Sequence, residues 1–430
     1  MLEKLFKLKE NQTSVKTEII AGLTTFLTMA YIIFVNPSIL SQTGMDQGAV
    51  FVATCLAAAV GCFIMGLYAN YPVAQAPGMG LNAFFTYTVV MQMGYTWEVA
   101  LGAVFVSGVC FILLSIFKIR AWIINSIPIS LRSGISAGIG LFLALIALKG
   151  CGIVVGNAAT IISLGDITTF QAVMGALGFF FIVALTHHKI KGAVVISILA
   201  VTVIGLVCGQ IKYTGFVSMP PSIAPTFLAL DLSGVFTLSM ISVIFAFLFV
   251  DLFDTAGTLM AVATESGMVD KNGRIPRMGR ALIADSTATA VGALFGTSNT
   301  TSYVESTAGV AEGGRTGLTA VTVGVLFLLA LFFAPLAGMV PAYATAGALL
   351  YVAILMISGL AKVDWKDLTE AAPVMVVSLM MPFTYSIANG IALGFISYAV
   401  IKLLSGRAKE VNIGVWIIAL IFLAKFIFLG

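Results

Sequence analysis

The sequence predicts an all-α polytopic membrane protein with about fourteen transmembrane segments, arranged as a seven-plus-seven inverted repeat. Composition is the first indication: 60% of the 430 residues are apolar and 9% are charged, whereas soluble domains are about 45–50% apolar and ~25% charged. Apolar runs of about 20 residues, enough to cross a hydrocarbon core, recur from Ile19 to the C-terminus. Gly, Pro and polar residues interrupt two of these runs at matching places, which is a transporter signature.

The basic residues of the loops determine the number and direction of the spans. With the N-terminus inside, pairs such as Lys189 and Lys191, or Lys362 and Lys366, all fall on the inner side, as the positive-inside rule requires. We therefore expect a multi-pass protein of an inner membrane, with both repeats embedded in lipid. The expected spans are 19–40, 48–68, 76–93, 98–117, 130–149, 170–186, 192–210, 237–262, 280–296, 297–313, 316–338, 343–361, 371–386 and 388–404.

These spans divide the chain into five segments. An odd number of spans in each half requires the second half to run inverted relative to the first. Whether residues 411–430 cross the membrane stays open, because Lys425 near their end can also reach an interface. The segments are a cytoplasmic N-terminal segment (1–18), a first seven-span repeat (19–210), a Pro-rich extracytoplasmic linker (211–236), a second seven-span repeat (237–404), and a cytoplasmic loop with a C-terminal apolar helix (405–430).

The two interrupted runs predict broken spans built from half-helices. They read NYPVAQAPGMGLNAFF (70–85) and GALFGTSNTTSYVESTAGV (292–310), and we match them at Gly80 and Gly296. Non-helical backbone is tolerated at membrane depth only where it lines a cavity or is buried in protein. Free N–H groups and half-helix dipoles at such breaks can bind a ligand. The alternative is that these glycines only let helices approach closely.

Three acids lie deep inside predicted spans, where a charge costs about 2.5–3.5 kcal/mol. Asp251 and Asp254 are three residues apart on one helical face, so both cannot easily stay ionised, which suits proton uptake and release. Glu305 lies among hydroxyl residues beside a break. For Asp251 an equally supported alternative is that it holds adjacent helices together. Asp285 has two such readings as well, a hydrogen bond to a facing helix or a proton relay.

Two carboxylates and the amide of Asn82 suit an uncharged planar ligand with both donors and acceptors, and a nucleobase fits that description. Phe84 is the aromatic residue that we expect to stack on such a ring. An anion is disfavoured, since no intramembrane Lys or Arg pair is present to receive it. No span shows a HExxH or CxxC motif, so we predict neither an enzyme nor a metal site. The small net charge of +4 lies in loops, which disfavours nucleic-acid binding.

Four segments carry a resemblance to a known family: EIIAGLTTFLTMAYIIFVNP (18–37), APGMGLNAFF (76–85), FDTAGTL (253–259) and TSYVESTAGVAEGGRTGLTAV (301–321). They resemble the nucleobase-cation symporter-2 family, and the azaguanine-type purine permease branch most closely. The resemblance implies a core domain of spans 1–4 and 8–11, and a gate domain of spans 5–7 and 12–14. It also implies that Asp254 and Glu305 contact the base, and that the third-span break at Asn82 contributes to the site.

The implied function is symport of purine bases with protons, driven by the proton gradient and by no other cofactor. Adenine-preferring members tend to lack the third-span Asn, so Asn82 favours hypoxanthine and guanine. An amide can pair with the six-oxo, N1–H edge that these two bases share. Adenine, xanthine and uracil stay open as alternative substrates, and a channel is an alternative of another class. Members of the family commonly form homodimers, so the resemblance also allows a homodimer.

Overall fold

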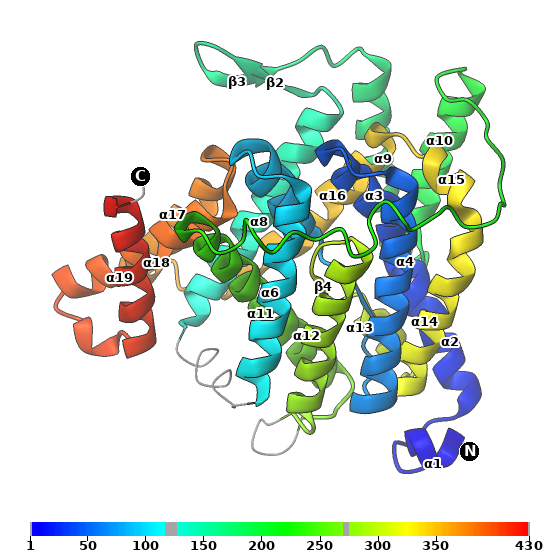
Figure 1. Cartoon of the computed structure of the whole chain (residues 1–430), viewed down its shortest axis with the longest axis horizontal. Helices are drawn as coiled ribbons and strands as arrows, with labels where there is room; N and C mark the ends of the chain where they lie inside the picture. Colours follow the sequence, from blue (N-terminus) through cyan, green and yellow to red (C-terminus); the bar gives the residue numbers. More distant parts are fainter. Residues whose placement is uncertain (1, 117–126, 270–274, 429–430) are drawn as a thin grey trace.

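The computed structural model describes residues 2–116, 127–269 and 275–428, and nearly all of its regular elements are helices (Figure 1). The predicted inner end of span 4 and the last two residues of the C-terminal helix lie outside the described residues. The first half contains α1 (Leu2–Phe6), α2 (Val15–Met29), α3 (Ile32–Leu40), η1 (Ser41–Thr43), α4 (Gln47–Ile64), η2 (Met65–Ala69), β1 (Gln75–Pro77), α5 (Met79–Ala83), η3 (Phe84–Gln92), α6 (Trp97–Ile116), α8 (Ile129–Gly150), β2 (Val154–Asn157), β3 (Ile161–Leu164), α9 (Phe170–His187) and α10 (Ala193–Val207).

The second half begins after the linker and contains the same kinds of element. Its members are α11 (Leu238–Glu265), α12 (Met278–Phe295), β4 (Thr300–Ser302), α13 (Ser306–Ala311), α14 (Gly317–Ala330), η4 (Leu331–Phe333), α15 (Ala334–Met339), α16 (Ala342–Ile357), η5 (Ser358–Lys362), α17 (Leu368–Phe383), α18 (Ile387–Leu404), η6 (Ala408–Glu410) and α19 (Ile413–Phe428).

Side-chain caps set where several long helices begin. A Ser, Thr or Asp side chain that accepts from a backbone N–H of the first turn satisfies a group that would otherwise lack a partner. Inside a membrane that satisfaction matters more, because water does not replace it. Helices α4, α9, α11, α17 and α18 begin in this way, at Asp46, Thr169, Thr237, Asp367 and Ser386.

Nine helical segments within the described ranges are long and apolar enough to cross a membrane. Three further apolar helices, among them α10 and α17, have 10–17 residues. The predicted spans 76–93 and 297–313 contain the short elements β1, α5 and η3, and β4 and α13. The polytopic helical fold is therefore confirmed, while the count of fourteen spans stays a prediction.

The first predicted span, 19–40, lies in one apolar helical segment, Val15–Thr43, which contains a short break. Helix α2 ends at Met29 and α3 begins at Ile32. Pro37 lies inside α3, and because proline has no N–H, the carbonyl four residues earlier receives no helical hydrogen bond from it. The break places Tyr31 between two helices, where its side chain is buried.

Two strands far apart in sequence meet at the two predicted breaks. β1 and β4 pair antiparallel, with Gln75 opposite Ser302 and Pro77 opposite Thr300. The match at Gly80 and Gly296 was wrong in its second member. Gly296 ends α12 with a φ of 96°, a left-handed conformation that glycine adopts without strain. The second break follows it, and α13 starts only at Ser306.

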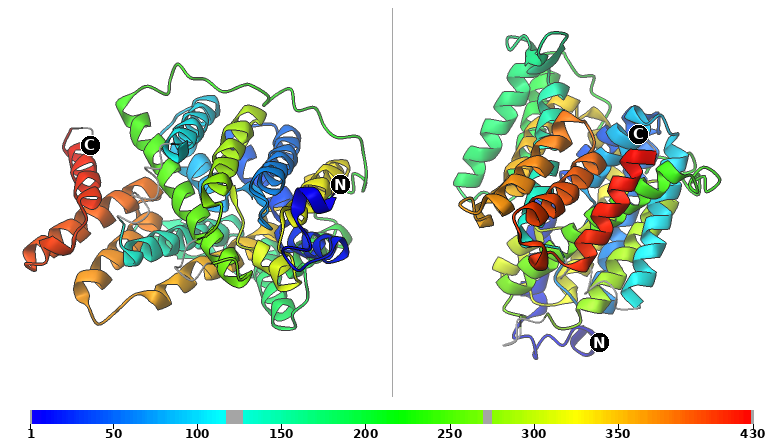
Figure 2. Two further views of the ribbon diagram at one scale, coloured as in Figure 1. Left: turned by 90° about the horizontal axis from the view of Figure 1, so that it is seen from below. Right: turned by 90° about the vertical axis from the view of Figure 1, so that its left-hand side faces the viewer.

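The long helices form two groups, which Figure 2 shows from two directions: α17 and α18 (orange) lie on the side opposite α2 and α4 (blue). Helix α8 packs against α16, α17 and α18, and α9 against α10 and α16. In the other group α12 packs against α4 and α6, and α14 against α2 and α4. The division into a core domain and a gate domain stays a prediction.

Two segments lie outside the helices, a hairpin that the sequence did not predict and the linker that it did. Strands β2 and β3 form a hairpin, with Val154 opposite Leu164, that extends beyond the helices in Figure 1. The linker 211–236 contains no regular element and runs around the bundle (Figure 2). Its backbone bonds to other parts of the chain, since Leu228 N–H donates to Leu294 O at 2.8 Å and Asp231 N–H to Glu98 O at 2.9 Å.

Candidate functional site

The site is built around the β1–β4 pair, from which the half-helices α5 and α13 start. Backbone bonds extend the pairing at both ends, from Gly78 N–H to Asn299 O and from Tyr303 N–H to Ala74 O, each 2.9 Å. The Tyr303 hydroxyl donates to Pro77 O at 2.6 Å. These bonds satisfy the backbone groups that a broken helix exposes, so the two half-helices are held in a fixed relation.

Asp285 supports the two strands from α12. Its Oδ1 accepts from the side-chain amide of Gln75 on β1 at 3.1 Å and from the hydroxyl of Ser302 on β4 at 2.8 Å. All three side chains are buried. Of the two roles considered for Asp285, the hydrogen bond to a facing element is the one that the structure contains.

Asp251 also accepts hydrogen bonds from two other elements. Its Oδ2 accepts from the Thr289 hydroxyl at 3.0 Å and from the Asn299 amide at 3.1 Å. The side chain is fully buried, and within the described ranges its Oδ1 has no hydrogen-bond partner. Asp251 therefore links α11 to α12 and to the segment before β4, which is the structural alternative considered for it.

Asp254 and Glu305 form the accessible acidic part of the site. The Asp254 side chain is exposed and that of Glu305 is half-buried. Their helices, α11 and α13, pack together. Tyr31 donates its hydroxyl proton to Glu305 Oε1 at 2.6 Å. Asp254 and Glu305, the pair that the family resemblance implies, thus lie on helices that pack together.

Asn82 lies in the first turns of α5 and is fully buried. Its Oδ1 accepts a hydrogen bond from the Ser298 hydroxyl, which comes from the segment between α12 and β4. Its Nδ2 has no partner in the part of the chain that the structure describes. The two breaks are therefore joined by a side-chain bond as well as by the strands.

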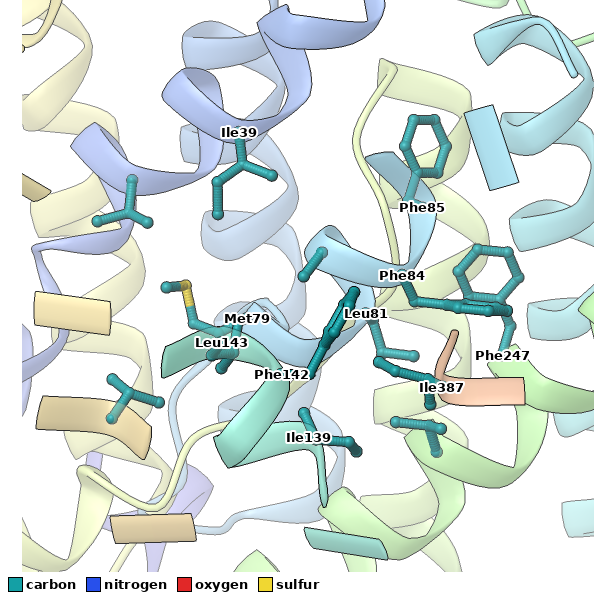
Figure 3. Close-up of a cluster of buried hydrophobic side chains, with 14 of the residues drawn as sticks. Ile39, Met79, Leu81, Phe84, Phe85, Ile139, Phe142, Leu143, Phe247 and Ile387 are labelled. Atoms are coloured by element: carbon teal, nitrogen blue, oxygen red, sulfur yellow. The ribbon is translucent and has the colours of Figure 1, made fainter. Parts of the chain in front are cut away.

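Phe84 lies in an apolar cluster rather than beside the carboxyl groups. Its ring meets that of Phe247 edge-on, with centroids 4.9 Å apart, and Figure 3 shows the two side chains pointing toward each other. Phe142 of α8 and Ile387 of α18 lie in the same cluster. Phe84 thus packs where the two groups of helices meet, and its predicted contact with a base stays a prediction.

Sequence reasoning missed two residues with clear roles in holding this region together. Tyr31 belongs to the segment 18–37 quoted above, where a tyrosine inside an apolar span is a signal for a buried hydroxyl partner. Glu18 lies in the same segment and is fully buried. Its carboxylate accepts from the backbone N–H groups of Arg315, Thr316 and Thr319 at 2.8 to 3.2 Å, an arrangement that the positive end of helix α14 favours.

The residues that the structure describes contain no group of His, Cys, Asp or Glu that could hold a metal ion. The donors and acceptors at the breaks are side-chain amides, hydroxyls and carboxyls. Such a set suits an uncharged polar ligand better than it suits a transition metal.

The comparison with known families agrees with the motifs at these breaks. The sequence model of a family described as the permease family matches residues 16–393, which include both half-helices and all the acids discussed above. The chain belongs to this permease family. It is the nucleobase-cation symporter-2 family that the four motifs resemble.

Relatives of this permease cover its full length. The adenine permease AdeP of Escherichia coli (strain K12) is 52% identical over 429 residues, covering 100% of this chain and 96% of that protein. The guanine/hypoxanthine permease PbuG of Bacillus subtilis (strain 168) is 46% identical over 440 residues, covering 100% of both. With its apolar helices, these relatives make the permease a multi-pass protein of the bacterial inner membrane.

Among solved structures, the transmembrane domain of the cyanobacterial bicarbonate transporter BicA has a similar fold. The TM-score is 0.62 at 16% identity, covering 89% of this chain and 97% of that one. At this identity the likeness concerns the fold alone. It shows that the arrangement of helices in this permease is shared with a transporter of distant sequence.

Proposed function

We propose that the permease imports purine bases together with protons by alternating access. The observation that carries the proposal is the position of Asp254 and Glu305, two acids on helices α11 and α13, which pack together beside the breaks. In transporters with inverted repeats, substrate and coupling-ion sites lie where such discontinuous helices meet. Membership of the permease family supports transport as the function class.

A neutral base is the ligand that this set of groups favours. Ionised carboxyl groups accept hydrogen bonds, and the Nδ2 of Asn82 donates them. A purine carries ring N–H donors and ring or exocyclic acceptors along its edges, so it can satisfy both. An anion would instead meet two negative charges without a compensating cation.

Proton coupling is proposed because both acids lie within predicted spans, on helices that pack together. Two like charges at short distance repel more strongly there than in water, and a proton on one of them removes that repulsion. When a base binds between them, a proton is expected to bind as well. Import driven by the proton gradient then follows from the shared site.

Hypoxanthine and guanine are the proposed substrates, and adenine is the second candidate. The free donor of Asn82 suits the six-oxo acceptor of the first two bases. Adenine is favoured by a different observation, the 52% identity to AdeP against 46% to PbuG. Xanthine and uracil come after these purines.

The proposed movement is that of the core domain against the gate. Helices α8 and α16 are the candidate gate elements, and each begins directly after a proline, Pro128 and Pro341. The apolar cluster in Figure 3 is where α5 contacts α8. The helices approach closely at Gly80, because a Cβ there would lie 2.5 Å from Ile139 Cγ2.

Uptake of labelled bases tests the proposal. The permease is expressed in a strain without base permeases of its own, and hypoxanthine, guanine, adenine, xanthine and uracil are compared with and without a protonophore. Purine uptake that the protonophore abolishes is expected. Absence of uptake for every base contradicts the proposed function, and uptake that persists with the protonophore contradicts proton coupling. Counterflow in proteoliposomes separates a carrier from a channel, since a channel gives none.

A further inference from the structure

Three consecutive buried residues after α12 each hold a polar side chain from a different helix. Thr297 accepts from the Asn36 amide of α3 at 2.9 Å. Ser298 donates to Asn82 of α5, and Asn299 donates to Asp251 of α11 at 3.1 Å. All three are fully buried, so the segment 297–299 positions side chains around the break.

The contact between Ser298 and Asn82 leaves the oxygen and the nitrogen of the Asn82 amide in different environments. Its Oδ1 is occupied by the Ser298 hydroxyl, while its Nδ2 has no partner within the described residues. A buried N–H group without a partner is costly, and such groups in native proteins call for an explanation. One explanation is a ligand that supplies a hydrogen-bond acceptor to Nδ2 of Asn82.

We propose that Ser298 is a specificity-determining residue, which fixes the Asn82 amide so that Nδ2 donates to the six-oxo oxygen of a purine. This inference rests on the proposed function and names the chemical feature that the site selects. Ser298 acts through Asn82 and is a positioning residue, because its hydroxyl bonds to the amide.

The selection follows from the polarity of position six of the ring. Hypoxanthine presents an oxygen acceptor there, whereas adenine presents an amino donor, which would leave the Nδ2 hydrogens facing other hydrogens. A site with a fixed polar group rejects a ligand of the wrong polarity, since its own buried group then stays unpaired. Without the Ser298 hydroxyl the amide is free to turn and to present Oδ1 to the amino group.

The test is the ratio of hypoxanthine to adenine uptake, measured as initial rates in cells without other base permeases. Ser298→Ala is expected to lower this ratio by about tenfold, the factor that the loss of one hydrogen bond typically produces. Ser298→Thr keeps a hydroxyl and is expected to retain the ratio. Thr297→Val is the matched control, since it removes the neighbouring hydroxyl that holds Asn36, and it is expected to lower both rates without changing the ratio.

Asn82→Asp serves as a second variant in case Ser298→Ala does not reach the membrane. It replaces the free donor by an oxygen and is expected to disfavour hypoxanthine relative to adenine. The inference is overturned if Ser298→Ala lowers both rates equally, if Asn82→Asp keeps the hypoxanthine preference, or if the unmodified permease prefers adenine. Absence of uptake of any base by the unmodified permease would instead refute the proposed function, so the two failures are distinguishable.

Discussion

The hydroxyl of Tyr31 donates a 2.6 Å hydrogen bond to Oε1 of Glu305, and so connects the break in the first span to the half-helix α13. This bond uses one of the two carboxyl oxygens of Glu305 and leaves the other for a ligand. We predict that Tyr31→Phe lowers the initial rate of purine uptake by about tenfold or more, as expected for a hydrogen bond to a charged group.

The matched control is Tyr343→Phe, which makes the same chemical change. The Tyr343 hydroxyl is buried without a hydrogen-bond partner among the residues that the structure describes, so its removal is expected to leave uptake unchanged. Equal uptake by Tyr31→Phe and the unmodified protein would show that the bond has no role in transport.

A second prediction concerns Glu305 itself. Glu305→Gln keeps the size of the side chain and removes its ability to exchange a proton, so proton-driven accumulation of base is expected to be lost. The protein should still reach the membrane. Glu312→Gln is the control, because Glu312 forms its 2.7 Å ion pair with Lys191 at partly exposed positions. Unchanged accumulation by Glu305→Gln would exclude a coupling role for this residue.

A third prediction tests the close packing of α13 against α2. A Cβ at Gly309 would lie 2.1 Å from Thr25 Oγ1 and 2.5 Å from Ala21 O, so Gly309→Ala is expected to destabilise the protein by about 1–3 kcal/mol. Thermal unfolding in detergent measures the effect. Gly338→Ala, where a Cβ meets no atom within 4 Å, is expected to keep or raise the midpoint. An unchanged midpoint for Gly309→Ala would contradict the packing.

A fourth prediction concerns Lys402, which is fully buried and pairs with Glu370 at 2.6 Å and Glu410 at 3.0 Å. Removing one partner of a buried pair costs about 3–5 kcal/mol. Since Glu370 and Glu410 are 22% and 47% exposed, Lys402→Met is expected to cost less than this range but to lower the unfolding midpoint measurably.

The control for Lys402→Met is Lys7→Met. The Lys7 and Glu10 side chains are 58% and 67% exposed, and an exposed pair contributes about 0–1 kcal/mol. If both variants unfold at the same temperature, the buried ion pair contributes nothing to stability.

A fifth prediction concerns acid stability outside the spans. Hydrogen bonds from Thr369 and from Arg407 lower the pKa of Asp367 to about 2. A lowered pKa in the folded state gives stability that is present above the ordinary carboxyl pKa of about 4, and that is lost as the pH falls through about 2. As the pH falls from 4 to 2, the thermal unfolding midpoint of Asp367→Asn should therefore decrease less than that of the unmodified protein. An identical acid profile for the two proteins would contradict this.

The sequence predicted the helical membrane fold and both breaks, because apolar length and interrupted runs are local signals. The pairing of Asp254 with Glu305 came from the resemblance of the motifs that carry them to the permease family, and not from a local signal. A helix-holding role for Asp251 was one of two alternatives, but its partners Thr289 and Asn299 could not be predicted, because the packing of their elements depends on the tertiary fold.

The pairing of β1 with β4, and the buried Glu18 carboxylate at the start of α14, could not be predicted from the sequence for a related reason. Three residues such as Gln75–Pro77 have no periodicity to detect, and they become a strand only by pairing with Thr300–Ser302. Glu18 precedes the first apolar run by one residue and is indistinguishable from a solvated charge. Only the approach of helix α14 makes it a buried acceptor.

The β1–β4 pair can form only late in the synthesis of this protein. Gln75 and Ser302 are 227 positions apart, so the first strand leaves the ribosome long before its partner exists. Until then its backbone N–H and C=O groups lack their final hydrogen bonds, a state that lipid does not tolerate. The first strand of the nascent chain must therefore stay in contact with water or with the insertion machinery until residues 300–302 have been synthesised and can pair with it.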